Sequence, residues 1–142
     1  MSREETTDNG IHFTTSSHNI PTPRRSTVGS VGFDFFSPVD ITIKSNEHIT
    51  INTGVRVAIP IGVGLFIYIR SSLGKQGIIL ANQVGVIDAD YKEEIKVILH
   101  NTSKLPYRIK KHDRIVQGVF MKCLLGEPVK GKRSGGIGST GV

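Results

Sequence analysis

The C-terminal end of the chain combines glycine with basic side chains, a composition that suits the binding of an anion. Residues 126–142 read G-E-P-V-K-G-K-R-S-G-G-I-G-S-T-G-V, with Lys130, Lys132 and Arg133 among the glycines. Glycines let backbone N–H groups approach a ligand closely, and the basic side chains supply positive charge. A segment with almost no core residues is equally typical of a loose chain end, so composition alone leaves both interpretations open.

The same segment contains the start of a phosphate-binding P-loop but does not complete it. Residues 126–132 match G-x-x-x-x-G-K, yet Arg133 stands where a P-loop needs Ser or Thr for Mg²⁺. A P-loop must also open a helix, and S-G-G-I-G at 134–138 is a poor helix former. The sequence therefore excludes a P-loop.

A second candidate segment is acidic and lies between two apolar stretches. Residues 85–95 read G-V-I-D-A-D-Y-K-E-E-I, which places Asp88, Asp90 and Tyr91 where a hairpin is expected to turn. Asp is a common turn residue because its side chain bonds to nearby backbone groups. Considered alone, the segment leaves two interpretations open: the aspartates either form a turn or have a chemical role.

Charge and composition limit the partners of the chain. Its 142 residues carry a net charge of +6 with a pI near 9.7, which favours an anionic partner: nucleic acid, a membrane surface or a phosphate-bearing small molecule. The first residues lack the apolar stretch of a secretory signal, and the longest nearly apolar run, 57–69, is too short to span a bilayer. The single cysteine, Cys123, cannot form an intrachain disulfide, so we expect an intracellular protein.

The elements that position these segments are expected to be strands. Ile and Val outnumber Leu and Ala about threefold, and β-branched residues favour sheets. Ile95, Val97 and Leu99 recur at every second position beside Lys96 and His100, and the apolar residues of 39–43, 49–59 and 107–109 alternate with polar residues in the same way. Turn signals separate these runs, which predicts one all-β domain, an antiparallel sandwich or barrel, with at most a short helical turn near 71–74.

Five separated segments resemble, in order, the motifs of the trimeric dUTPase family. They are V-G-F-D-F-F-S at 31–37, R-S-S-L-G at 70–74, the 85–95 segment, D-R-I-V-Q at 113–117 and G-G-I-G-S-T-G at 135–141. The resemblance implies hydrolysis of dUTP to dUMP and pyrophosphate with Mg²⁺, in nucleotide metabolism and in excluding uracil from DNA. It also implies a jelly-roll-like β-clip fold and a homotrimer with shared active sites.

The resemblance divides the chain into three parts. Residues 1–19 are expected to be a flexible N-terminal extension, and residues 20–125 the dUTPase-like β-barrel domain. Residues 126–142 become a C-terminal arm that is exchanged between subunits and closes an active site. This arm gives the glycine-rich, basic end of the chain a function in binding phosphate.

The resemblance also assigns the site residues. Asp88 matches the general base that deprotonates the attacking water, Gln117 matches a residue at the phosphate and water, and Asp34 and Arg114 support the site. Nucleoside contacts fall on Asn82, Gly85, Val86, Ile87, Tyr91 and Ile137. Phosphate contacts fall on Arg70, Ser71, Ser72, Gln117, Lys132, Arg133, Gly138 and Ser139. No residue is expected to bind Mg²⁺ directly, because the triphosphate and water hold it.

Departures from the family pattern support an alternative function. Ile137 replaces a stacking Phe, Lys132 an arginine and Glu93 a glycine. These changes suggest a catalytically weak dUTPase homologue that acts as an interaction or signalling module. The related dCTP deaminases are disfavoured because Ile98 stands at the position of their proton-shuttling glutamate. Nucleic acid is an unlikely partner because few aromatic residues interleave with the basic clusters.

Overall fold

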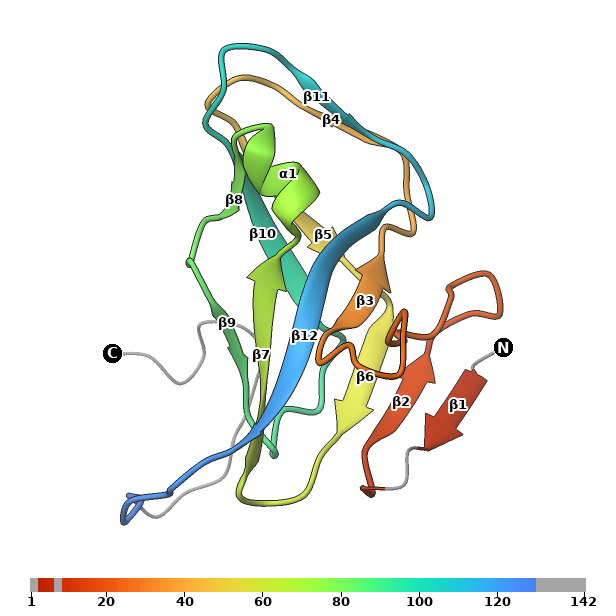
Figure 1. Cartoon of the computed structure of the whole chain (residues 1–142), viewed down its shortest axis with the longest axis vertical. Helices are drawn as coiled ribbons and strands as arrows, with labels where there is room; N and C mark the ends of the chain where they lie inside the picture. The colour runs from red at the N-terminus through yellow and green to blue at the C-terminus, as the bar shows by residue number, and fades with distance from the viewer. Residues whose placement is uncertain (1–2, 7–8, 130–142) are drawn as a thin grey trace.

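The computed structural model describes residues 3–6 and 9–129, and within these ranges the chain is almost entirely β-structure (Figure 1). The strands are β1 (Arg3–Thr6), β2 (His12–Thr15), β3 (Phe33–Phe36), β4 (Ile41–Ile43), β5 (His48–Asn52), β6 (Val55–Ala58), β7 (Val63–Ile69), β8 (Ile78–Leu80), β9 (Gly85–Ile87), β10 (Lys96–Asn101), β11 (Tyr107–Ile109) and β12 (Arg114–Lys122). The expected helical turn is present as the short helix α1 (Ser71–Lys75).

All the strand pairs in the described residues are antiparallel, as the sequence predicts. They form four sheets with the orders β1-β2-β6, β5-β10-β8, β11-β4 and β3-β12-β7-β9. The last of these sheets carries most of the motifs, because β12 lies between β3 and β7 and β9 adds to the other edge of β7 (Figure 1). Segments far apart in the sequence thus become neighbours.

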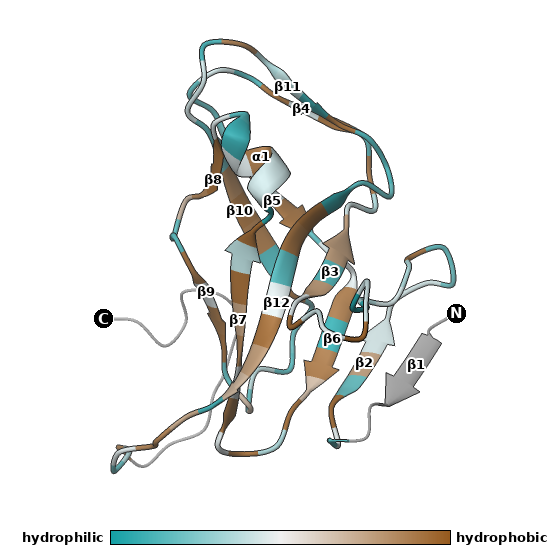
Figure 2. Ribbon diagram, viewed as in Figure 1, coloured by the Kyte–Doolittle hydropathy of each residue, from teal (hydrophilic) through white to brown (hydrophobic). Residues whose placement is uncertain are grey.

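The core lies where the apolar faces of the sheets meet. In β10, Val97 and Leu99 are buried while Lys96 and Ile98 are half-buried, so the alternation in the sequence marks the face that packs inward. Figure 2 shows hydrophobic residues along β7, β9 and β10 and hydrophilic residues in the connecting loops. The largest fully buried side chains are Phe13, Phe35, Ile43, Leu65, Ile67, Ile78, Ile95, Leu99, Ile109, Ile115, Val55 and Val116.

The N-terminal part of the chain differs from the flexible extension expected for residues 1–19. Strand β2 pairs with β6, and β1 pairs with β2, so this segment adds a sheet to the domain. Ile11 and Phe13 are buried, and Phe13 lies against Phe33, Phe35 and Phe120 with ring centroids 5.5–6.1 Å apart. The reason is a short period-2 pattern at 11–15 that the surrounding Ser, Thr and Asn residues obscure.

Phe13→Ala is therefore expected to lower the free energy of unfolding by about 3–5 kcal/mol, because it removes a buried ring from an aromatic cluster. Urea denaturation followed by circular dichroism, at one protein concentration, measures the change. Val31→Ala is the control, since Val31 is 73% exposed, and it should change stability by about 0.5 kcal/mol or less. Equal stabilities for the two variants would contradict the packing of this segment.

Candidate active site

Gln117 lies at the centre of the β3-β12-β7-β9 sheet, on the face turned away from the core. It is in register with Asp34 on β3 and with Tyr68 on β7. The next residue, Gly118, faces the core, where a Cβ would lie 2.7 Å from Leu65. The amide of Gln117 packs over the backbone of Gly32, and a Cβ at Gly32 would approach Gln117 Oε1 to 2.6 Å. The first glycine of the 31–37 motif therefore makes room for the glutamine of the 113–117 motif.

Two arginines converge on one carboxylate beside this glutamine, and we call Ser26, Asp34, Arg70 and Arg114 the Asp34 cluster. Arg70 Nε lies 3.5 Å from Asp34 Oδ1, and Arg114 Nη1 lies 3.5 Å from Asp34 Oδ2. Ser26 Oγ donates to Asp34 Oδ2 at 2.9 Å. Because Asp34 comes from β3, Arg70 from the end of β7 and Arg114 from the start of β12, the cluster joins three of the motifs.

The Asp34 cluster keeps a net positive charge, since two guanidinium groups face one carboxylate. The side chains of Arg70 and Arg114 are 27% and 48% exposed, whereas that of Asp34 is 12% exposed. The carboxylate thus orients the arginines from below while their outer faces reach solvent. Arginine in this arrangement is suited to binding phosphate oxygens.

Arg24 and Ser26 are residues of this region that the sequence analysis missed. Arg24 pairs with Asp34 through the backbone, and its guanidinium lies 5.8 Å from the ring centroid of Phe36. Both residues line a cleft together with Arg25, Asp34, Phe36 and Arg114. The only feature of the sequence that pointed to this region was the basic pair at 24–25. A basic pair does not indicate that it lies next to Asp34 in the folded chain.

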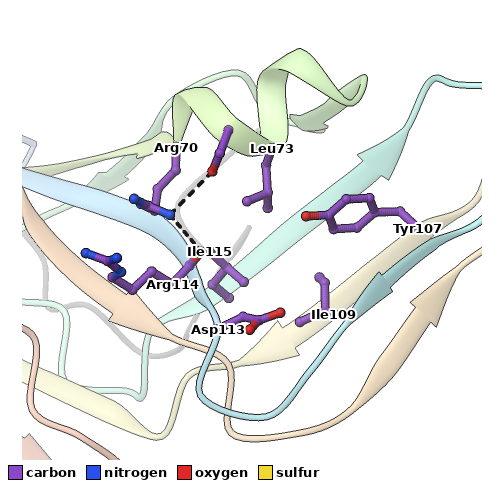
Figure 3. A pocket seen from close by; sticks show the side chains of 8 residues that line it. Arg70, Leu73, Tyr107, Ile109, Asp113, Arg114 and Ile115 are labelled. Carbon is purple, nitrogen blue, oxygen red and sulfur yellow. Dashed lines mark hydrogen bonds between the residues drawn. The ribbon is translucent and has the colours of Figure 1, made fainter.

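A second cavity lies on the other side of Arg70 and Arg114, beneath α1 (Figure 3). Arg70 Nη1 donates to Ser72 Oγ and to the carbonyl oxygen of Arg114, both at 3.4 Å, which ties the helix to β12. The hydroxyl of Tyr107 points into this cavity (Figure 3). Burial and, to a lesser degree, the nearby Asp113 raise the pKa of Tyr107, while Arg70 acts in the opposite direction, so the phenol stays protonated and can donate a hydrogen bond.

The acidic segment forms a turn at the edge of the same sheet but not the expected hairpin, because β9 pairs with β7 while β10 pairs with β5 and β8. In β9, Gly85 packs tightly on β7, where a Cβ would lie 3.1 Å from Ile67 Cβ, while Val86 is 58% exposed and Ile87 is buried. Asn82 is exposed in the connection between β8 and β9, where its carbonyl accepts the N–H of Val84 at 2.7 Å. Strand β9 and the β8–β9 connection therefore present Asn82, Val86 and open backbone at one edge of the sheet.

Asp88 follows β9 directly and is exposed. Its carbonyl accepts the N–H of Tyr91 at 3.1 Å, which closes the turn, and the Tyr91 hydroxyl donates to the carbonyl of Glu94 at 3.0 Å. The ring of Tyr91 is 5% exposed and belongs to the core. The turn is thus present with Asp88 exposed in it, and a chemical role of the segment stays a prediction.

Within one chain, the Asp34 cluster and Asp88 lie at opposite ends of β7. Ile87 pairs with Leu65 near the start of this strand, and Arg70 follows its end. Five positions of extended chain between Leu65 and Arg70 span about 17 Å. The phosphate-type residues and the acidic turn are therefore two half-sites in one chain. The predicted arm residues Lys132, Arg133, Ile137, Gly138 and Ser139 lie outside the described residues.

These observations define a class of protein: an antiparallel, jelly-roll-like β-protein with a cationic cluster around Asp34 and a separate acidic turn. The family model for dUTPase matches residues 18–141, and the chain belongs to the dUTPase family. It is 40% identical over 131 residues to a deoxyuridine 5'-triphosphate nucleotidohydrolase of Desulfitobacterium hafniense, covering 84% of this chain and 87% of that protein.

Two solved structures show the same fold. The dUTPase of Streptococcus mutans is 28% identical, with a TM-score of 0.73 over 88% of this chain and 98% of that one. A mutant dUTPase from phage phi11 of S. aureus, whose structure reveals the coordination of a structural Mg(II) ion, has a TM-score of 0.77 at 22% identity, covering 89% of this chain and 99% of that one. In the described ranges, no helix has the length and apolar character needed to cross a membrane.

Proposed function

We propose that this protein hydrolyses dUTP to dUMP and pyrophosphate. The observation that carries this proposal is that three family motifs meet in a cationic half-site around Asp34, while a fourth motif presents an exposed Asp88 at the end of β9. The relatives are named as hydrolases of this substrate, which favours an enzyme over the alternative of a catalytically weak interaction module. The intracellular location expected from the single cysteine stays a prediction.

Asp88 acts as the general base in this proposal. Its carboxylate accepts a proton from a water molecule, and the water oxygen forms a bond to the α-phosphorus. The bond between the α-phosphorus and the oxygen bridging to the β-phosphorus breaks, so pyrophosphate leaves with that oxygen and dUMP keeps the new one. The exposure of Asp88 at the end of β9 supports this role, because the base must reach both solvent and substrate.

The phosphate chain is assigned to the half-site at the other end of β7. Arg70, Ser71 and Ser72 supply positive charge and hydroxyl donors, while Gln117 supplies an amide that contacts phosphate and orients the water. Asp34 and Arg114 support the site by fixing the direction of Arg70. The outward-facing guanidinium groups of Arg70 and Arg114 support the assignment, since arginine binds phosphate oxygens through two N–H groups at once.

Strand β9 and the connection that leads into it from β8 are assigned to the nucleoside. Asn82 and the backbone at 85–87 would bond to the edge of uracil, and a narrow slot would exclude the methyl group of thymine. The buried ring of Tyr91 would form a firm wall beneath the deoxyribose and leave no space for a 2′-hydroxyl. The close approach of Gly85 to Ile67, where β9 packs against β7, supports this assignment.

Mg²⁺ is the proposed cofactor, and it would neutralise charge on the triphosphate. Mg²⁺ prefers oxygen ligands and keeps several of its waters. In residues 3–6 and 9–129, no three His, Cys, Asp or Glu side chains gather into a metal site. Because of these preferences of Mg²⁺, we assign its ligands to phosphate oxygens and water, with the arginines of the Asp34 cluster neutralising the remaining charge.

A homotrimer with shared active sites is the proposed assembly. The half-sites of one chain lie about 17 Å apart along β7, whereas the attacking water must contact the base and the α-phosphorus together. A complete site therefore needs Asp88 from one subunit and the Asp34 cluster from another. We assign closure of the site to the C-terminal arm, residues 126–142, of which residues 130–142 lie outside the described ranges.

Mixing two inactive variants tests the sharing of sites. Asp88→Asn and Arg70→Ala each damage a different half-site, so each homotrimer is expected to be nearly inactive. Co-expression in equal amounts should restore about a quarter of the wild-type activity per chain, because random assembly leaves that share of sites with two intact halves from different subunits. Mixed trimers as inactive as their parents would contradict a site shared between chains.

Pyrophosphate release from a panel of nucleotides tests the function itself. With Mg²⁺ present, dUTP should be hydrolysed at least about 100-fold more efficiently than UTP, dTTP or dCTP, because unpaired groups and steric overlap penalise each analogue. Binding of dUTP without turnover would instead favour the interaction module. Equal turnover of dTTP would contradict the assignment of a slot that excludes the thymine methyl group.

A further inference from the structure

Two histidines face each other on the outer surface of the β5-β10-β8 sheet, away from the proposed active site. His48 on β5 and His100 on β10 are directly opposite in the strand register. The flanking residues of β10, Leu99 and Asn101, are buried, so His100 belongs to the outward-facing set. His48 is exposed and His100 half-buried, and both imidazoles can be reached from solvent.

The backbone geometry brings these side chains close together. The N–H of Asn101 donates to the carbonyl of Glu47 at 3.1 Å, so the hydrogen bonds of the ladder flank the histidine pair and do not join the two histidines. Side chains of such non-hydrogen-bonded pairs are the closest cross-strand neighbours in an antiparallel sheet. The two imidazole centroids lie 4.1 Å apart with an interplanar angle of 51°.

We propose that His48 and His100 form a chelating site for a divalent transition-metal ion such as Zn²⁺. Imidazole nitrogen is a preferred ligand of Zn²⁺, Ni²⁺ and Cu²⁺, at about 2.0–2.1 Å from Zn²⁺. Two imidazoles on one tetrahedral ion have centroids roughly 5 Å apart, which follows from that bond length. The observed pair has to open by only about 1 Å, a change that rotation of exposed side chains allows.

The sheet gives this pair a chelate effect that scattered surface histidines lack. Because β5 and β10 are paired along their length, the two ligands are already held together, and binding loses little conformational entropy. In the described ranges no third His, Cys, Asp or Glu completes the group, so water would fill the other ligand positions. The opposite neighbour of His100 on β8 is Ile79, an exposed apolar residue.

This site differs in chemistry from the Mg²⁺ proposed for the substrate. Mg²⁺ prefers oxygen ligands, whereas the histidine pair offers two nitrogen ligands. The pair lies on β5 and β10, and none of the residues assigned to substrate lies on either of these strands. Its ligation can therefore be measured without nucleotide and without reference to hydrolysis.

Titration of the full-length, tag-free protein with Zn²⁺ tests the site by calorimetry, with histidine ring signals followed by NMR. We expect one Zn²⁺ per chain, and changes in the ring signals of His48 and His100 together. His48→Gln and His100→Gln should each weaken Zn²⁺ binding about tenfold or more, because a single imidazole gives no chelate effect. His18→Gln, which removes an exposed histidine in a turn, is the matched control and should leave the affinity unchanged.

Mg²⁺ at the same concentrations should leave the ring signals unchanged. The proposal is overturned if the wild-type protein binds no Zn²⁺. It is also overturned if either His48→Gln or His100→Gln retains wild-type affinity, or if His18→Gln lowers the affinity as much as they do. Both substitutions lie on a solvent-facing sheet surface, and unchanged circular dichroism would confirm that the variants are folded.

Discussion

Asp88→Asn is expected to lower kcat for dUTP hydrolysis by about 10³-fold, within the range attributed to general-base catalysis. Asparagine has nearly the same shape as aspartate but cannot accept the proton of the attacking water. The turn should survive, because two contacts of Tyr91 close it. The N–H of Tyr91 donates to the backbone carbonyl of residue 88, and the Tyr91 hydroxyl donates to the backbone carbonyl of Glu94. Steady-state kinetics with pyrophosphate detection measures the loss.

Nucleotide binding separates a catalytic role of Asp88 from a structural one. The variant should bind a non-hydrolysable dUTP analogue within about threefold of the wild-type affinity, because the nucleoside and phosphate contacts are assigned to other residues. A large fall in affinity with little change in kcat would show that Asp88 acts in binding and not as the base. Retention of the wild-type kcat would remove the proposed mechanism altogether.

Asp34→Asn is expected to lower kcat/KM by about 100-fold, which corresponds to roughly 2.7 kcal/mol of transition-state stabilisation. Arg70 and Arg114 lie against different oxygens of this carboxylate. An asparagine keeps one of these oxygens and replaces the other with an NH₂ group, which cannot accept a hydrogen bond from arginine. One guanidinium therefore loses its orientation, and the phosphate half-site loses its order. Asp34 is thus a positioning residue, which acts on the substrate through the arginines.

Stability distinguishes positioning from a general structural role. The two arginines are partly exposed, so water can solvate them after the change, and the free energy of unfolding should fall by about 1 kcal/mol or less. Asp40→Asn is the matched control: Asp40 pairs with Arg108 at 3.9 Å, both side chains are more than half exposed, and activity should be unchanged. Equal kcat/KM values for the two variants would contradict the positioning role of Asp34.

Much of the fold could be predicted from local patterns. The alternation at 95–99 identified the buried face of β10 because a strand turns successive side chains to opposite sides, whatever its partners are. The short helix at Ser71–Lys75 lies where the sequence analysis allowed a helical turn. At the N-terminus, the alternation at 11–15 contains only two apolar residues, Ile11 and Phe13, and the polar composition around it concealed a strand that contributes Phe13 to the core.

The amino-acid sequence by itself determined the family, the strand-rich fold and the identity of the candidate residues, because motifs and periodicity are properties of short segments. Only the tertiary structure decided which of these residues meet. Strand pairing places Asp34, Arg70 and Arg114 together across 80 positions of sequence and adds Arg24 and Ser26, yet it separates Asp88 from them along β7. Long-range pairing and register are set by the packing of complete sheets, and short segments do not encode them.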